Sequence, residues 1–232
     1  MREIVLDTET TGLNPLTGDR LVEIGCVEIF NRIPTGQVYH VYLNPQRDMP
    51  VEAFNVHGLS SEFLADKPLF AQVADDFLAF IAGDPLVIHN AAFDIGFLNA
   101  ELAKIGRPAL TFDRVIDTLS LARRRHPGAS NRLDDLMNRY GINSSRRTKH
   151  GALLDSELLA EVYAELCGGK QTALSLTASE ATVIVIEGQV ASPMQRPRPL
   201  APRGNEAEAA AHAAFIATLG ENAIWKDYTA GS

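Results

Sequence analysis

The spacing of apolar and polar residues divides the chain into a run of strands and then a run of helices. Apolar runs rich in β-branched and aromatic residues, bounded by turn residues, predict strands over 3–9, 20–31, 37–44 and 85–90. Apolar residues three and four apart predict helices over 69–83, 93–106, 114–125, 131–140 and 151–169. This order predicts a mixed α/β sheet with helices packed on its faces.

The composition of the chain changes after Gly169. Thr, Ser, Ala, Gln, Pro and Arg dominate residues 170–204, which predicts a flexible linker, although a strand-like apolar run interrupts it at 181–188. Asn205, followed three residues later by Glu208, is typical of a helix start, and Gly220 ends that helix. We therefore expect a folded domain over 1–169, a linker over 170–204 and a short helical tail over 205–232.

Composition places the chain among globular proteins of the cytoplasm. Of its 232 residues, 46% are hydrophobic and 22% charged, which is typical of soluble domains. No apolar run approaches the roughly 20 residues that a membrane span needs. The sequence enters the first strand directly, so we expect no signal peptide. Cys26 and Cys167 are far apart in sequence, so we expect free thiols in a reducing compartment.

The charge distribution is uneven. The formal net charge of −8 argues against a globally basic surface for nucleic acid. Between Arg114 and Lys149, however, nine basic residues stand against three acidic ones. Two interpretations remain open for this stretch, a solvated face or a local patch that contacts phosphates.

Two carboxylates, Asp7 and Glu9, close the first predicted strand in the segment "IVLDTETTGL". Residues two apart on a strand point to the same side, so these side chains converge. Convergent carboxylates repel unless a cation lies between them, and oxygen ligands suit Mg²⁺ or Mn²⁺. Taken alone, the pair is better interpreted as two surface acids.

Two further motifs add to this pair. Asp94 stands in the first turn of a helix that follows a strand, where an acid is also ordinary for a helix start. His150 and Asp155 would point about 140° apart on an ideal helix, so they converge only if His150 lies on the loop before it, which Gly151 permits. The four carboxylates match the charge of two divalent ions, and a site neutralised in this way can accept an anionic phosphodiester. A histidine beside it can take a proton from the attacking water.

The segments "LDTETTG", "HNAAFD" and "HGALLD" resemble the three motifs of the DEDDh class of 3′→5′ exonucleases, most closely the proofreading subunits of bacterial DNA polymerase III. The resemblance covers residues 3 to about 169. It implies a ribonuclease-H-like fold, hydrolysis of DNA that releases 5′-mononucleotides, and two bound Mg²⁺ or Mn²⁺ ions. It places the general base at His150 and the metal ligands at Asp7, Glu9, Asp94 and Asp155.

The resemblance also implies where the 3′-terminal nucleotide lies. The turn after the first strand, with Thr10, Gly12 and Leu13, is expected to lie against it. For four further residues, substrate contact and a purely structural role are equally open: His57, His89, Asn90 and Phe93.

The segment after the domain carries two features that are expected to bind partners. "QTALSL" resembles the short peptides that dock on the sliding clamp, with Gln171, Leu174 and Leu176 as the contact residues. The tail has apolar residues without a core of their own, which favours an anchor for another protein over a frayed end. The resemblance implies that Phe215, Leu219 and Trp225 bind the α subunit of DNA polymerase III. The sequence leaves open whether a small accessory subunit also binds.

Two other functions compete with a proofreading exonuclease. One is a free-standing nuclease of the same class that trims RNA or single-stranded DNA, although such a protein needs no linker with an aromatic anchor. The other is an inert scaffold that tethers polymerase to clamp, although all five residues of the catalytic motifs are intact.

Overall fold

The computed structural model describes residues 1–145, 149–169 and 205–219. They fall into two separate units, of which the first includes residues 1–145 and 149–169 and the second includes the helix α8. Within these ranges, no helix is both long enough and apolar enough to cross a membrane.

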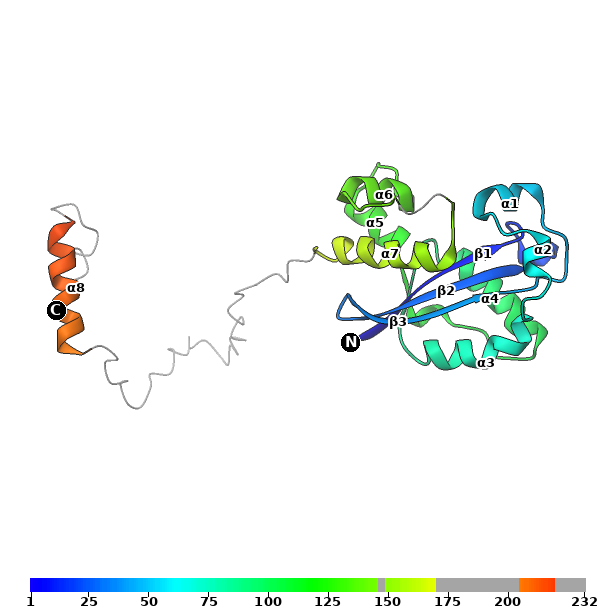
Figure 1. Cartoon of the computed structure of the whole chain (residues 1–232), viewed down its shortest axis with the longest axis horizontal. Helices are drawn as coiled ribbons and strands as arrows, with labels where there is room; N and C mark the ends of the chain where they lie inside the picture. The colour runs from blue at the N-terminus through cyan, green and yellow to red at the C-terminus, as the bar shows by residue number, and fades with distance from the viewer. Residues whose placement is uncertain (146–148, 170–204, 220–232) are drawn as a thin grey trace, which may run out of the picture. The chain divides into compact units, whose positions relative to one another are not determined.

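The domain is built on one five-stranded sheet with the order β3-β2-β1-β4-β5 (Figure 1). Its strands are β1 (Arg2–Thr10), β2 (Leu21–Phe30), β3 (Ile33–Tyr42), β4 (Leu86–Ile88) and β5 (Val115–Asp117). The pairs β1–β2 and β2–β3 are antiparallel, whereas β1–β4 and β4–β5 are parallel. The expected mixed sheet is therefore confirmed.

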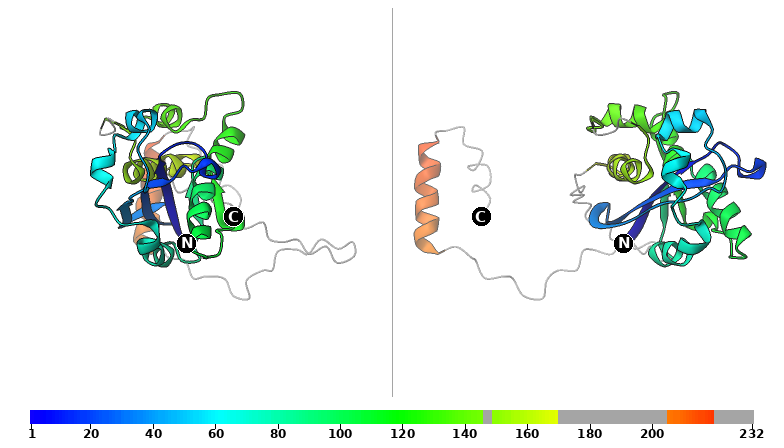
Figure 2. Two further views of the ribbon diagram at one scale, coloured as in Figure 1. Left: turned by 90° about the vertical axis from the view of Figure 1, so that its right-hand side faces the viewer. Right: turned by 45° about the vertical axis from the view of Figure 1, so that its right-hand side comes forward.

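Helices cover both faces of the sheet (Figure 2). They are α1 (Val51–His57), α2 (Ser61–Leu64), α3 (Phe70–Ile81), α4 (Ala92–Lys104), α5 (Thr118–Arg125), α6 (Leu133–Tyr140) and α7 (Ala152–Leu166). Ile4 and Leu6 of β1 pack with α3 and α4, whereas Val5 packs with α7. Because strand side chains alternate between faces, Asp7 and Glu9 lie on the same side as Val5, toward α7.

Two parts of the sequence prediction were wrong. Residues 115–117 pair with β4, so they form strand β5 and not the start of a helix. Helix α5 begins at Thr118, and the side chain of Asp117 caps it by accepting a hydrogen bond from Leu119 N. Helices α1 and α2 were not predicted. The apolar residues Val51, Phe54 and Val56 of α1 are largely exposed, so no buried stripe marks this helix in the sequence.

The first turn of α7 lies directly against β2 at Gly25. A Cβ atom at this position would lie 2.3 Å from the backbone of Ala152 and Leu153, closer than any real contact. The Ser156 hydroxyl also donates a hydrogen bond to the Gly25 carbonyl at 2.9 Å. Since Gly25 pairs with Asp7 across the sheet, this packing brings the start of α7 beside the end of β1.

The C-terminal unit contains α8 (Glu206–Thr218). The Asn205 side chain accepts from Glu208 N at 2.9 Å and the Glu208 side chain accepts from Asn205 N at 3.0 Å, so the expected helix start is confirmed. No side chain of α8 is buried, and Phe215 is 60% exposed. The expectations for the linker over 170–204, the run at 181–188 and Gly220 fall outside the described residues.

Candidate active site

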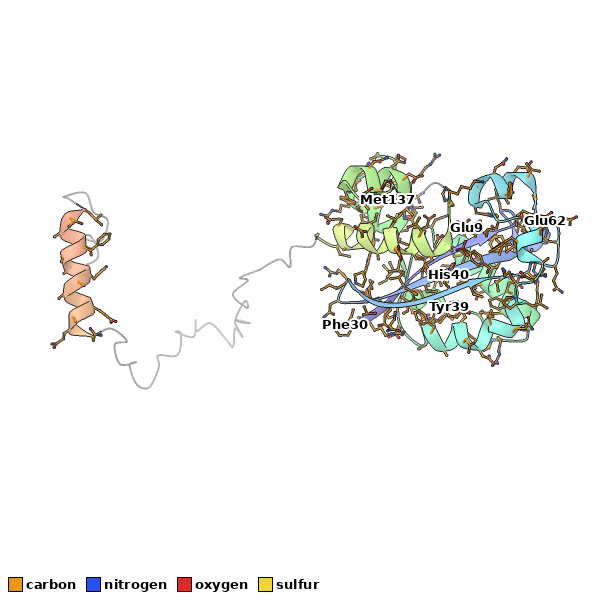
Figure 3. All side chains as sticks on the ribbon, in the orientation of Figure 1. Glu9, Phe30, Tyr39, His40, Glu62 and Met137 are labelled. Atoms are coloured by element: carbon orange, nitrogen blue, oxygen red, sulfur yellow. The ribbon has the colours of Figure 1, made fainter. Side chains whose placement is uncertain are left out.

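Four carboxylates from three elements meet at the carboxyl end of β1. Asp7 and Glu9 come from β1, Asp94 from the first turn of α4 and Asp155 from the first turn of α7. Glu9 is labelled in Figure 3, near the start of α7. The cavity between these elements measures about 180 Å³ and is lined by Asp7, Thr8, Glu9, His89, Asn90, Phe93, Asp94, Leu133, His150 and Asp155.

His150 lies in the loop before α7, as the sequence predicted. Gly151 caps the helix in an extended conformation, with φ of −163°, and the backbone N–H of His150 donates to the Val56 carbonyl at 3.2 Å. His150 Nδ1 therefore reaches Asp155 Oδ2 at 3.2 Å. Glu9, His150 and Asp155 each offer one ligand atom within 4.8 Å of the others, a spacing that a single metal ion could bridge.

The electrostatics of the cavity favour a bound cation. Burial raises the pKa of Asp94 to about 7, although the hydrogen bond from Thr8 Oγ1 at 2.7 Å opposes this rise. Burial also raises the pKa of Asp7 well above its usual range, and the charges of Asp94, Glu9 and Asp155 add to the effect. No Lys or Arg is among the described residues that line this cavity. Oxygen donors with unbalanced negative charge fit hard divalent ions such as Mg²⁺ or Mn²⁺.

A second cavity of about 460 Å³ adjoins the first and shares Thr8, Glu9 and Phe93 with it. Its walls come from the turn after β1 and from α1, and they include the expected substrate residues Thr10, Gly12, Leu13, His57 and Phe93. The structure thus places these five side by side, next to the carboxylates. A volume of this size is within the range of small-ligand sites.

The turn that follows β1 is held by its own hydrogen bonds. Thr10 Oγ1 donates to the Gly12 carbonyl at 2.6 Å. A Cβ atom on Gly12 would lie 2.4 Å from the Asp19 carboxylate, so glycine makes room for that side chain. Leu13 is 85% exposed at the rim of the cavity. The glycine therefore has a structural role of its own, whatever the cavity holds.

Three of the expected substrate residues line a cavity and also have a contact within the protein: His57, His89 and Asn90. His57 Nδ1 accepts from Leu59 N at 3.0 Å, while its buried Nε2 has no hydrogen-bond partner within the described part of the chain. His89 Nδ1 contacts the Thr118 hydroxyl at 2.9 Å. Asn90 has a positive φ of 64° and donates its N–H to the Asp117 carboxylate at 3.1 Å.

Some residues of the site were not picked out from the sequence. Ala53 and Val56 of α1, with Pro50 just before it, form one wall of the second cavity. Gly25 makes the close packing of α7 possible. A glycine inside a strand interior is a known signal of close backbone approach, so Gly25 could have been found in the segment "EIGCVE".

Comparison with known proteins assigns the chain to a family. The model of the RNase T type exonuclease family matches residues 4–163. DNA polymerase III subunit epsilon of Rickettsia conorii is 52% identical over 186 residues, which cover 79% of this chain and 81% of the relative. The chain belongs to the exonuclease family of DNA polymerase III epsilon subunits. It is a 3′→5′ exonuclease, and therefore a hydrolase.

Other relatives and solved structures agree with this assignment. The epsilon subunit of Pasteurella multocida is 41% identical over 97% of this chain and 93% of the relative. A structure of exonuclease X in complex with 5′-overhanging duplex DNA matches with a TM-score of 0.56 at 25% identity, covering 71% of this chain and 90% of that one. The nuclease domain of 3'hExo, a DEDDh family member bound to rAMP, matches with a TM-score of 0.63 at 16% identity, covering 72% and 91%. The expected ribonuclease-H-like fold is thereby confirmed.

The raised pKa of Asp94 predicts how stability depends on pH without metal. Its pKa rises from an ordinary value of 3.8 to about 7, so the folded protein binds the proton more tightly than the unfolded chain. Its contribution to the free energy of unfolding is therefore full below about pH 4 and is lost as the pH rises through 7. Denaturant unfolding in EDTA between pH 4 and 8 should show this fall, and Asp94→Asn should make it shallower. An unchanged slope in Asp94→Asn would contradict the assignment, and the exposed Asp48→Asn serves as the control.

Proposed function

We propose that the chain proofreads newly made DNA, removing single nucleotides from the 3′ end as 5′-mononucleotides for the replicative polymerase III. The convergence of Asp7, Glu9, Asp94, His150 and Asp155 on one cavity supports this proposal most directly. The relatives that are named epsilon subunits support the connection with the polymerase.

Two divalent ions, Mg²⁺ or Mn²⁺, are held by Asp7, Glu9, Asp94 and Asp155 in this proposal. The buried, mutually repelling carboxylates supply the negative charge and oxygen ligands that such ions need. Bound ions of this kind stabilise the charge that develops on the attacking and leaving oxygens of a phosphodiester. The hydrogen bond from Thr8 fixes the orientation of Asp94 before any ion binds.

His150 serves as the general base. Its contact with Asp155 at 3.2 Å orients the imidazole ring, and the carboxylate stabilises the positive charge that forms when His150 takes a proton from the attacking water. The hydrogen bond from His150 N to Val56 fixes the backbone of the loop at the same point.

The terminal nucleotide occupies the cavity of about 460 Å³ beside the carboxylates. Leu13 and Phe93 offer apolar surfaces to its base, and the turn at Thr10 and Gly12 lies along its sugar. His57 lines the same wall. His89 and Asn90 line the carboxylate cavity, where the scissile phosphate would lie.

The tail tethers this domain to the replication machinery of the cytoplasm. The domain comprises residues 1–169, the linker 170–204 and the polymerase-binding tail 205–232. Phe215 and Leu219 are exposed on or just after α8, as an anchor for the polymerase α subunit requires. The remaining expected contacts, Trp225 for the polymerase and Gln171, Leu174 and Leu176 for the sliding clamp, lie outside the described residues.

Isosteric substitutions test the catalytic assignment. Asp7→Asn, Glu9→Gln, Asp94→Asn and Asp155→Asn should each remove most Mn²⁺-dependent hydrolysis of 3′-labelled single-stranded DNA, because each removes a charge that the ions need. His150→Ala should lower kcat about 10²- to 10⁴-fold, the effect typical of general-base loss. Mn²⁺ should raise the Tm of His150→Ala as much as it raises the Tm of the wild type, because the ligands remain.

The control for these variants is His40→Gln, because His40 pairs with Glu23 outside the carboxylate cavity. This variant should hydrolyse at close to the wild-type rate. A carboxylate variant with the wild-type rate at saturating Mn²⁺ would lose its place as a ligand. Unchanged kcat in His150→Ala would assign the base role to another group.

Truncation tests the role of the tail. A protein of residues 1–169 should hydrolyse single-stranded DNA normally, because the buried core of the domain ends with α7. It should no longer co-elute with the polymerase α subunit. Phe215→Ala with Trp225→Ala should weaken this association, and Leu174→Ala with Leu176→Ala should weaken only clamp binding. Full-strength polymerase binding by the truncated protein would show that the tail is not the anchor, whereas no polymerase binding by the full chain would favour a free-standing nuclease.

A further inference from the structure

A third cavity continues the row formed by the two cavities of the active site. It measures about 510 Å³ and shares His89, Asn90 and Leu133 with the carboxylate cavity, but shares no residue with the terminal-nucleotide cavity. The carboxylates therefore lie between the two larger cavities. Leu119, Arg123, Ala129, Ser130, Asn131 and Arg132 complete its lining.

The contacts of the basic stretch from Arg114 to Lys149 show which residues are available to a ligand. Arg114, Arg125, Arg139 and Lys149 each donate to a backbone carbonyl of the protein itself. Arg123, Arg124 and Arg132 are exposed and have no hydrogen bond or ion pair with any described residue. Of these three, Arg123 and Arg132 line the third cavity and Arg124 does not.

Hydrogen bonds within the protein fix one loop that lines the third cavity. The Asn131 amide nitrogen donates to the carbonyls of Ala129 at 2.9 Å and His126 at 3.3 Å, which fixes the loop that leads to Arg132. Asn131 is 7% exposed, so this contact is shielded from water. Arg123 projects from α5 and Arg132 from the start of α6, so two separate elements present a positive charge to the same space.

We propose that this cavity binds the nucleotide on the 5′ side of the scissile bond, with Arg123 and Arg132 on the phosphate that precedes that nucleotide. The inference rests on the proposed function, because it needs the terminal nucleotide in one large cavity and the scissile phosphate at the carboxylates. A strand that continues past the carboxylates then enters the third cavity. Guanidinium groups bind phosphate oxygens through charge-assisted hydrogen bonds and carry no base preference, which suits a strand of any sequence.

Two thymidine dinucleotides separate this contact from the catalytic chemistry. TpT and pTpT contain the same scissile bond and the same terminal nucleotide, but only pTpT carries the phosphate that precedes the penultimate nucleotide. Release of TMP from both substrates by the wild-type protein with Mn²⁺ shows the hydrolysis at the 3′ end on which the proposed function depends. If the wild type cleaves neither dinucleotide nor a longer oligonucleotide, the proposed function itself fails.

Arg123→Gln with Arg132→Gln should raise KM for pTpT about 10-fold, because the substitutions remove a hydrogen bond to a charged group. KM and kcat for TpT should stay at their wild-type values. On a single-stranded oligonucleotide, the slope of log binding constant against log salt concentration should fall by about 0.7 for each phosphate that the variant no longer neutralises. Arg124→Gln is the matched control from the same helix and should change none of these quantities.

Two results would overturn the proposal. If the double variant changes KM for TpT and pTpT equally, the arginines do not contact the preceding phosphate. If it behaves like Arg124→Gln on pTpT and on the oligonucleotide, the strand does not pass through the third cavity. Thermal unfolding of each variant, followed by circular dichroism, shows whether an effect reflects damage to the fold.

Discussion

The packing of α7 against β2 at Gly25 determines the geometry of the active site. A side chain at this position would overlap the backbone of Ala152 and Leu153, so the first turn of α7 can approach the sheet only because the residue is glycine. The hydrogen bond from Ser156 to the Gly25 carbonyl holds the two elements in register. Asp155 and His150 thereby reach Asp7 and Glu9, which belong to a part of the chain more than 140 positions away.

This packing has an electrostatic cost in the protein without metal. It concentrates carboxylates where burial raises the pKa of both Asp7 and Asp94. The lining of this cavity offers no Lys or Arg among the described residues to balance them. A site of this kind favours divalent cations over water, and a cluster neutralised in this way would accept a phosphodiester that the bare carboxylates would repel. Arg123 and Arg132 of the basic stretch line the neighbouring third cavity, so their positive charges are separate from the proposed metal ligands.

Much of the fold could be predicted from the sequence, because most strands and helices bury a clear apolar face. The start of α8 was also predictable, since a capping box is a local pattern. Helix α1 could not be predicted, because its apolar residues face solvent and the second cavity. Strand β5 was missed because three residues carry no periodicity, and only pairing with β4 defines them.

Part of the candidate site could likewise be predicted from the sequence, and part could not. Motif spacing predicted that Asp7 and Glu9 share a side of β1 and that His150 needs a loop to reach Asp155, and both geometries are present. The sequence did not indicate which of the basic residues between Arg114 and Lys149 face a cavity, because this depends on tertiary hydrogen bonds to distant carbonyls.

The central claim is that the packing of α7 against Gly25 determines the geometry of the active site. Mn²⁺ affinity in Gly25→Ala, compared with Gly83→Ala at a site with open space around it, tests this claim most directly. We predict that Gly25→Ala lowers the free energy of unfolding by about 1–3 kcal/mol, as overpacking does, and weakens Mn²⁺ binding, while Gly83→Ala changes neither. Wild-type Mn²⁺ affinity in a folded Gly25→Ala protein would contradict the account.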